Sequence, residues 1–198
     1  PGVPFALDIL WHDVDTEEGD RLYGLMDVYA DTAYEVGIGI TEVDVVRGPD
    51  DVVKTADVET AGPSPSNYSL LSIGACSVDD PSVSFYIELK PIHSNISPEA
   101  IKVHGLDLDT LATTGIPPRT AMKRFRDWIV NITPPDHKPV FIGFNAPFDW
   151  MFVNDYFHRY LGSNPFGHAA IDIRSYYMGL RKVTSGQASM KQIAQQYG

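Results

Sequence analysis

The segment Val52-Val53-Lys54-Thr55-Ala56-Asp57-Val58-Glu59-Thr60-Ala61-Gly62 decides how the rest of the chain is organised. Its apolar and β-branched residues predict a buried strand, and two carboxylates, Asp57 and Glu59, stand two positions apart near its end. Residues i and i+2 of a strand point to the same face, so these carboxylates should lie side by side. They would repel each other unless a cation lay between them, and oxygen ligands of this kind suit Mg²⁺ or Mn²⁺. For this motif alone, a strand end whose acids only meet solvent is the simpler interpretation.

Length and composition narrow the class of protein. The 198 residues, 43% of them hydrophobic, suffice for one domain with an appendage. The single cysteine, Cys76, cannot form an intramolecular disulfide, which favours a reducing compartment. No apolar run approaches the roughly 20 residues that span a bilayer, so we expect a cytoplasmic protein. The net charge of −11 disfavours a sequence-independent duplex binder, although metal ions can supply positive charge locally.

Apolar periodicity predicts an α/β fold from about residue 51 to residue 198, with a mixed sheet flanked by helices. Strands are expected at 52–58, 69–78, 82–90, 139–143 and 170–171, and helices from Pro98, at 120–132, 146–161, 172–180 and 189–197. Residues 1–50 are expected to form an N-terminal extension with a helix from Thr16 to Val36, because several apolar residues fall at helical spacing. This extension is interpreted as a segment packed on the main domain or as a partner-binding surface.

A second motif, Gly143-Phe144-Asn145-Ala146-Pro147-Phe148-Asp149-Trp150, lies where a predicted strand passes into a helix. Ligands bind at the carboxyl ends of strands in α/β sheets, so Asp149 could meet Asp57 and Glu59 there. Asn145 and Asp149 would share a helix face if both are helical. Alternatively, Asn145 caps the helix and Asp149 only interacts with the helix dipole.

Taken together, these motifs resemble the DEDD superfamily of 3′→5′ exonucleases. The resemblance rests on the Asp-x-Glu strand end, Leu70-Leu71-Ser72-Ile73-Gly74, Ile101-x-x-His104-Gly105-Leu106, and Asn145-Ala146-Pro147-Phe148-Asp149. It covers about residues 52–198 and is closest to the DEDDh branch, which includes ribonuclease T, oligoribonuclease and proofreading exonuclease domains. It implies a ribonuclease-H-like fold and hydrolysis of phosphodiester bonds at the 3′ end of single-stranded DNA or RNA, with two Mg²⁺ or Mn²⁺ ions.

The same resemblance implies roles for individual residues. Asp57 would bridge both metals, Glu59 would bind the nucleophile-side metal, and Asp149 would hold the second metal. The resemblance also implies five substrate-binding residues. The backbone of Val58 and Thr60 would receive the terminal 3′-hydroxyl, and Asn145 is a further candidate. Leu71 and Phe148 could stack against bases or be core residues. A nucleoside 5′-monophosphate would be the product. Some relatives are dimers, which leaves a homodimer open.

The family pattern also needs a fourth carboxylate, and in the DEDDh branch a histidine five residues before it, both on a helix near the C-terminal end. Only His104 has an acid at +5, Asp109, but it falls between the two motifs and is interpreted as structural. Either the natural polypeptide continues past Gly198 with these residues, which is the favoured interpretation, or this is a degenerate member. The 198-residue chain is therefore expected to be catalytically impaired. Two other hypotheses are a non-catalytic binding or scaffold module on the same fold, and a metal-dependent phosphoesterase with a small substrate.

Overall fold

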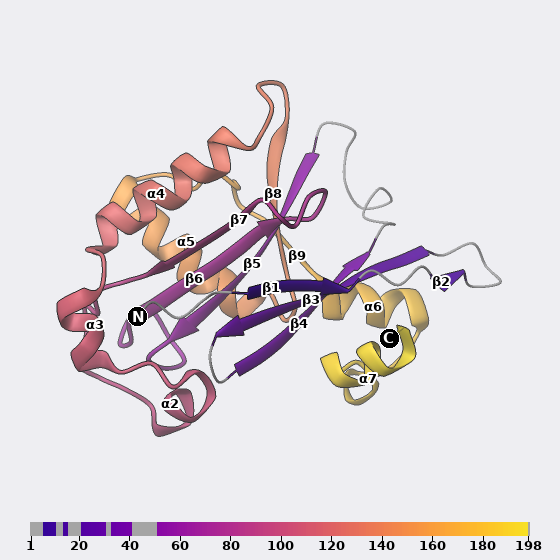
Figure 1. Ribbon diagram of the computed structural model, residues 1–198, viewed down its shortest axis with the longest axis horizontal. Coiled ribbons are helices and arrows are strands. Elements are labelled where there is room, and N and C mark those ends of the chain that lie inside the picture. Colours follow the sequence, from indigo (N-terminus) through magenta and orange to yellow (C-terminus); the bar gives the residue numbers. More distant parts are fainter. Residues whose placement is uncertain (1–5, 11–13, 16–20, 31–32, 41–50, 198) are drawn as a thin grey trace.

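The computed structural model describes residues 6–10, 14–15, 21–30, 33–40 and 51–197, with side chains described from residue 52 onward except at 101, 194, 196 and 197. A five-stranded mixed sheet in the order β7-β6-β5-β8-β9 forms the centre of the main domain (Figure 1). β5 pairs antiparallel with β6 and parallel with β8, so the predicted mixed sheet is confirmed. The strands are β5 Asp51–Thr60, β6 Leu70–Ser77, β7 Ser84–Glu88, β8 Lys138–Gly143 and β9 Ala170–Asp172.

Helices follow the strands largely where the apolar periodicity predicts them. They are α2 Pro98–His104, α3 Leu108–Thr114, α4 Pro118–Asn131, α5 Pro147–Leu161, α6 Ile173–Arg181 and α7 Met190–Tyr197, with a short 3₁₀ turn at Ser185–Gln187. Pro98 occupies the first helical position, where its missing N–H costs nothing. α3 has no counterpart in the sequence-based expectation, and Asp107 caps it by accepting a hydrogen bond from the Thr110 N–H at 2.9 Å. None of the described helices is long and apolar enough to cross a bilayer.

The core lies on both faces of the sheet because the side chains of β5 alternate between them. Ala56 and Val58 face the larger cluster, which α4 and α5 complete with aromatic residues such as Phe125 and Phe157. These two rings stack with centroids 5.6 Å apart, which fixes α4 against α5. Figure 1 shows the two helices side by side. Val53 points the other way, into a smaller cluster with residues of β8, α6 and α7. Asp57 and Glu59 share that second face further along the strand and are half-buried.

The prediction of a helix between Thr16 and Val36 is wrong. The described part of the extension forms strands: β1 Ala6–Leu10, β2 Val14–Asp15, β3 Arg21–Ala30 and β4 Ala33–Ile40. β3 pairs antiparallel with β1, β2 and β4. Within the two longer strands apolar residues recur at a period of two, at 26, 28 and 30 and again at 34, 36, 38 and 40. Glycines at 24, 37 and 39 disfavour a helix. The N-cap expected at Thr16 lies outside the described residues, and the boundary near residue 51 stays a prediction.

Candidate active site

The end of β5 presents Asp57 and Glu59 on one face of the sheet. In the β6 register Asp57 lies opposite Gly74 and Glu59 opposite Ser72, so no bulky cross-strand side chain crowds either carboxylate. Pairing between β5 and β8 ends at Thr55 opposite Ile142. Beyond that point no described strand pairs with β5 in parallel, and the backbone N–H groups of β5 on that side need another acceptor.

Asp149 supplies that acceptor. Its Oδ1 receives a hydrogen bond from the Val58 N–H at 3.1 Å, across 91 residues of sequence. Val58 is the residue between Asp57 and Glu59, so the structure brings the carboxylate of Asp149 to the backbone that carries the pair. Asp149 is buried, with 4% of its surface exposed, and it lies in the first turn of α5. There its charge also interacts favourably with the helix dipole.

The turn before α5 is held in place by a contact that the sequence analysis missed. Asn145 adopts a left-handed backbone conformation with φ of 59°, which asparagine tolerates better than most residues. The next backbone N–H, of Ala146, donates to Asp172 Oδ1 at 3.0 Å. Asp172 ends β9 and also caps α6, through Oδ2 and the Ser175 N–H. An acid at the carboxyl end of a predicted parallel strand is the signal that could have identified it.

The expected helical position of Asn145 and the expected base contact of Leu71 need correction, whereas a substrate-binding role for Asn145 stays a prediction. Asn145 precedes the helix, Ala146 is the N-cap, and no side chain caps this helix, so Asn145 and Asp149 do not share a helical face. Leu71 is fully buried beside Ala61 and Leu111, so it presents no surface to a base. It is a core residue, the alternative that the sequence left open.

The other predicted substrate residues lie close to the site. The side chain of Val58 is in the core, while its N–H binds Asp149. Thr60 is buried, and its hydroxyl donates to the Gly62 carbonyl at 2.9 Å. Phe148 is partly buried and packs against Phe152 with ring centroids 5.6 Å apart. A role in substrate binding stays a prediction for these three residues.

Two further titratable groups lie near the end of β5: Tyr86 interacts with Glu59, and His104 with the backbone of Thr60. Across β6, the Tyr86 hydroxyl donates to Glu88 Oε1 at 2.9 Å. Burial, followed by the Glu88 carboxylate, raises the pKa of Tyr86, so the phenol stays protonated and acts as a donor. His104 is buried, its Nδ1 accepts a hydrogen bond from the Leu106 N–H at 2.9 Å, and burial lowers its pKa. These contacts fit the structural interpretation of His104.

The donor set of Asp57, Glu59 and Asp149 consists of carboxylate oxygens, the ligands that Mg²⁺ and Mn²⁺ prefer. Within the described part of the chain, however, no three His, Cys, Asp or Glu side chains are arranged so that they could hold a metal ion. The chain therefore supplies suitable donor chemistry at one place, without a converged ligand set.

Comparison with known proteins agrees with this fold. No family model matches the chain. A curated protein, the 3′-5′ DNA exonuclease Cap18 of Escherichia coli, is 49% identical over 135 residues, which cover 68% of this chain and 72% of that protein. Product-bound exonuclease I is similar in structure, with a TM-score of 0.53, 16% identity, and coverage of 67% of this chain and 32% of that one. E. coli exonuclease I in complex with a dA16 oligonucleotide has a TM-score of 0.53 and 17% sequence identity, and the match covers 66% of this chain and 29% of that one.

The chain thus spans about a third of the length of exonuclease I. The structural similarity to exonuclease I supports the assignment of the fold of this chain. The mixed sheet with acids at the end of its central strand defines a ribonuclease-H-like exonuclease fold. On the identity to the curated relative, the chain belongs to the DEDD superfamily of 3′–5′ exonucleases.

Proposed function

We propose that this protein is a divalent-metal-dependent exonuclease that removes nucleotides from the 3′ end of single-stranded nucleic acid. The observation that carries the proposal is the hydrogen bond from the Val58 N–H to Asp149. It joins the two motifs of the family at one point, although they lie far apart in sequence. Asp57 and Glu59 share one face of β5, and a cation between these two carboxylates would relieve their mutual repulsion, which is a reason to expect metal binding.

In the proposed mechanism Asp57 would be shared by two divalent ions, and Glu59 and Asp149 would each help to hold one of them. Two bound ions would supply an activated water nucleophile and stabilise the leaving oxygen. The chain's own contribution is to fix the ligands. Asp149 is tied to β5 through Val58, and the turn before α5 is tied to β9 through Asp172. The backbone of residues 58–60 is the proposed site for the terminal 3′-hydroxyl.

Single-stranded DNA is the first substrate to test. The curated relative is named a DNA exonuclease, and exonuclease I has been crystallised with a dA16 oligonucleotide. RNA as a substrate and a homodimer as the assembly stay predictions from the family resemblance. The 2′-hydroxyl contact that separates RNA from DNA depends on the shape of the bound complex.

The test uses the longest natural polypeptide that carries these residues, with a 5′-labelled single-stranded oligonucleotide and Mn²⁺. The expected result is stepwise shortening from the 3′ end with release of nucleoside 5′-monophosphates, abolished by EDTA and by Asp57→Ala. Absence of metal-dependent release would contradict the proposal.

A non-catalytic binding module on the same fold is the second candidate. One observation favours it: no three side chains in the described residues are arranged to hold a metal ion. Oligonucleotide binding that is unaffected by EDTA, together with absence of cleavage, would support this alternative. Competition by a nucleoside 5′-monophosphate would argue against a phosphoesterase with an unrelated small substrate.

A further inference from the structure

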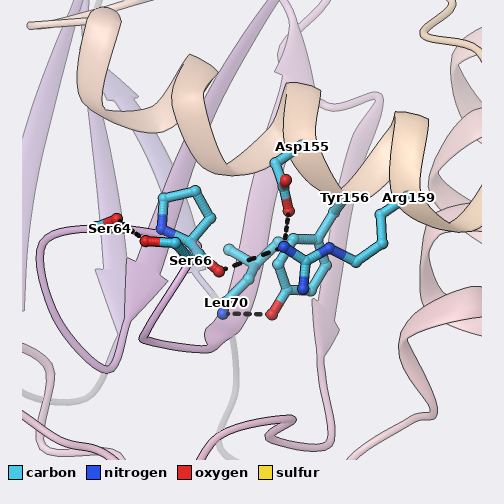
Figure 2. Close-up of polar contacts among 7 residues, drawn as sticks. Ser64, Ser66, Leu70, Asp155, Tyr156 and Arg159 are labelled. Atoms are coloured by element: carbon cyan, nitrogen blue, oxygen red, sulfur yellow. Dashed lines mark hydrogen bonds and ion pairs between the residues drawn. The ribbon is translucent and has the colours of Figure 1, made fainter.

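Helix α5 contacts the segment after the acidic pair at two further places, beyond Asp149. Tyr156 is fully buried, and its hydroxyl accepts a hydrogen bond from the Leu70 N–H at 2.9 Å, at the start of β6. Arg159 Nη2 donates to the Pro65 carbonyl at 3.5 Å. Figure 2 shows both side chains reaching from the helix toward the loop between β5 and β6. The acid of the active site and the loop are therefore attached to one rigid element.

The three contacting residues lie along one side of α5. Tyr156 is seven residues after Asp149, two helical turns, and Arg159 follows three residues later. Together they extend over about 15 Å of helix at 1.5 Å per residue. A displacement of α5 would move the Asp149 carboxylate and the loop together, because the helix itself is the connection.

Arg159 is itself fixed by neighbouring groups. It forms an ion pair with Asp155 Oδ2 at 2.9 Å, and its guanidinium lies 5.8 Å from the centroid of the Tyr156 ring (Figure 2). The Tyr156 ring in turn makes an edge contact with Tyr160, with centroids 5.4 Å apart. A guanidinium held by a carboxylate and an aromatic ring suits a positioning role, because little rotamer freedom is lost when it binds the loop.

The loop between β5 and β6, residues 61–69, begins two positions after Glu59. Its base is closed by the hydrogen bond from the Ala61 N–H to the Ser69 carbonyl at 2.8 Å. Its tip exposes Ser66 and Asn67, and the hydroxyls of Ser64 and Ser66 lie 2.7 Å apart. The loop lies at the carboxyl end of the central strand, where ligands of α/β sheets bind. Its exposed polar groups are suited to contact the backbone of an entering single strand.

We propose that Tyr156 and Arg159 are positioning residues that hold the loop of residues 61–69 as a fixed platform for the nucleotides upstream of the scissile bond. This inference rests on the proposed nuclease function and extends it from the reacting phosphate to the neighbouring part of the substrate. Neither side chain takes part in the chemistry. Their effect is to keep the loop in register with the carboxylates, so their loss should matter more for a long substrate than for a short one.

The first experiment compares two substrates, a single-stranded oligonucleotide and the p-nitrophenyl ester of thymidine 5′-monophosphate, which has no upstream nucleotides. The variants are Tyr156→Phe and Arg159→Gln in the longest natural polypeptide. We expect the ratio of kcat/KM for the oligonucleotide to kcat/KM for the ester to fall about tenfold, mainly through KM, as for the loss of one hydrogen bond to a charged or buried group.

Arg126→Gln is the matched control. Arg126 forms an ion pair with Asp127 at 2.7 Å, and its 37% exposure matches the 36% of Arg159. Its contacts are on α4, away from the loop, so the substrate ratio should stay within about twofold of the wild type because surface ion pairs contribute little. An equal fall for both substrates in the Tyr156 and Arg159 variants, or no fall in either, would overturn the proposal.

A second measurement does not depend on activity. In Tyr156→Phe the Leu70 N–H loses its acceptor, and its hydrogen exchange should become about five- to tenfold faster, with no comparable change in β8. Unchanged exchange at Leu70 would overturn the proposal. A wild-type protein that released no nucleotide would instead overturn the proposed function, and the exchange measurement would still decide whether α5 holds the loop.

Discussion

Substitution of Asp149 by asparagine or by alanine separates its two roles. Oδ1 of Asp149 accepts the Val58 N–H at 3.1 Å in a buried position. Asparagine keeps a carbonyl oxygen that can accept the same bond, but it removes the negative charge. Alanine removes both the acceptor and the charge. The two variants should therefore differ in stability and agree in activity.

The expected loss of stability follows from the hydrogen bond between the Val58 N–H and Asp149. A buried N–H without a partner costs about 1–3 kcal/mol, and for a chain of 150–250 residues each kcal/mol shifts Tm by roughly 2–4 °C. Asp149→Ala should therefore lower Tm by about 2–12 °C, whereas Asp149→Asn should stay close to the wild type or exceed it, since a buried charge is removed. Both variants should lose activity by more than the roughly 10–100-fold that loss of an outer-shell partner of a metal site costs.

The assay combines thermal melts, with and without Mn²⁺, with oligonucleotide cleavage. Metal that binds only the folded state at 100 times its Kd stabilises by about 2.7 kcal/mol, and this increment should be lost in Asp149→Asn. An Asp149→Asn protein that cleaves the oligonucleotide at the wild-type rate would refute the assignment of a metal-binding role. An Asp149→Ala protein with unchanged Tm would show that the contact with Val58 contributes no stability.

Three other substitutions test neighbouring contacts. Asp172→Ala removes the acceptor of the Ala146 N–H and the cap of α6, so it should cost about 1–3 kcal/mol in chemical denaturation and reduce cleavage as well. Burial lowers the pKa of His104 below its usual 6.5, so its contribution to the free energy of unfolding should be fully present above pH 6.5 and should decrease below it. His104→Asn keeps an acceptor for the Leu106 N–H, and the difference in Tm between pH 7.5 and pH 5.5 should therefore become smaller in this variant. Gly143→Ala would place a Cβ 3.3 Å from the Ala56 carbonyl oxygen, so a loss of about 1–3 kcal/mol is expected, and an unchanged Tm would contradict this.

Local patterns in the sequence were sufficient for most of the main domain. The β-branched run from Val52 and the amphipathic helices α4 and α5 have one dominant period each, so their type is determined by short-range physics. The prediction for the N-terminal extension was wrong because no single period dominates there. Around Leu22, Met26 and Val36 the apolar residues fit both a helix and a strand, and antiparallel pairing with neighbouring strands decided between them.

The sequence by itself determined the kind of chemistry available: carboxylates two apart on a strand must share a face, and their oxygens suit hard divalent cations. Only the tertiary structure decided which distant groups join them. Because β8 stops pairing with β5 at Thr55, the Val58 N–H is left for Asp149, and because α5 begins directly after β8, the same helix also reaches Leu70 and Pro65. Contacts of this kind depend on where strands end and helices begin in space, which no local period of the sequence encodes.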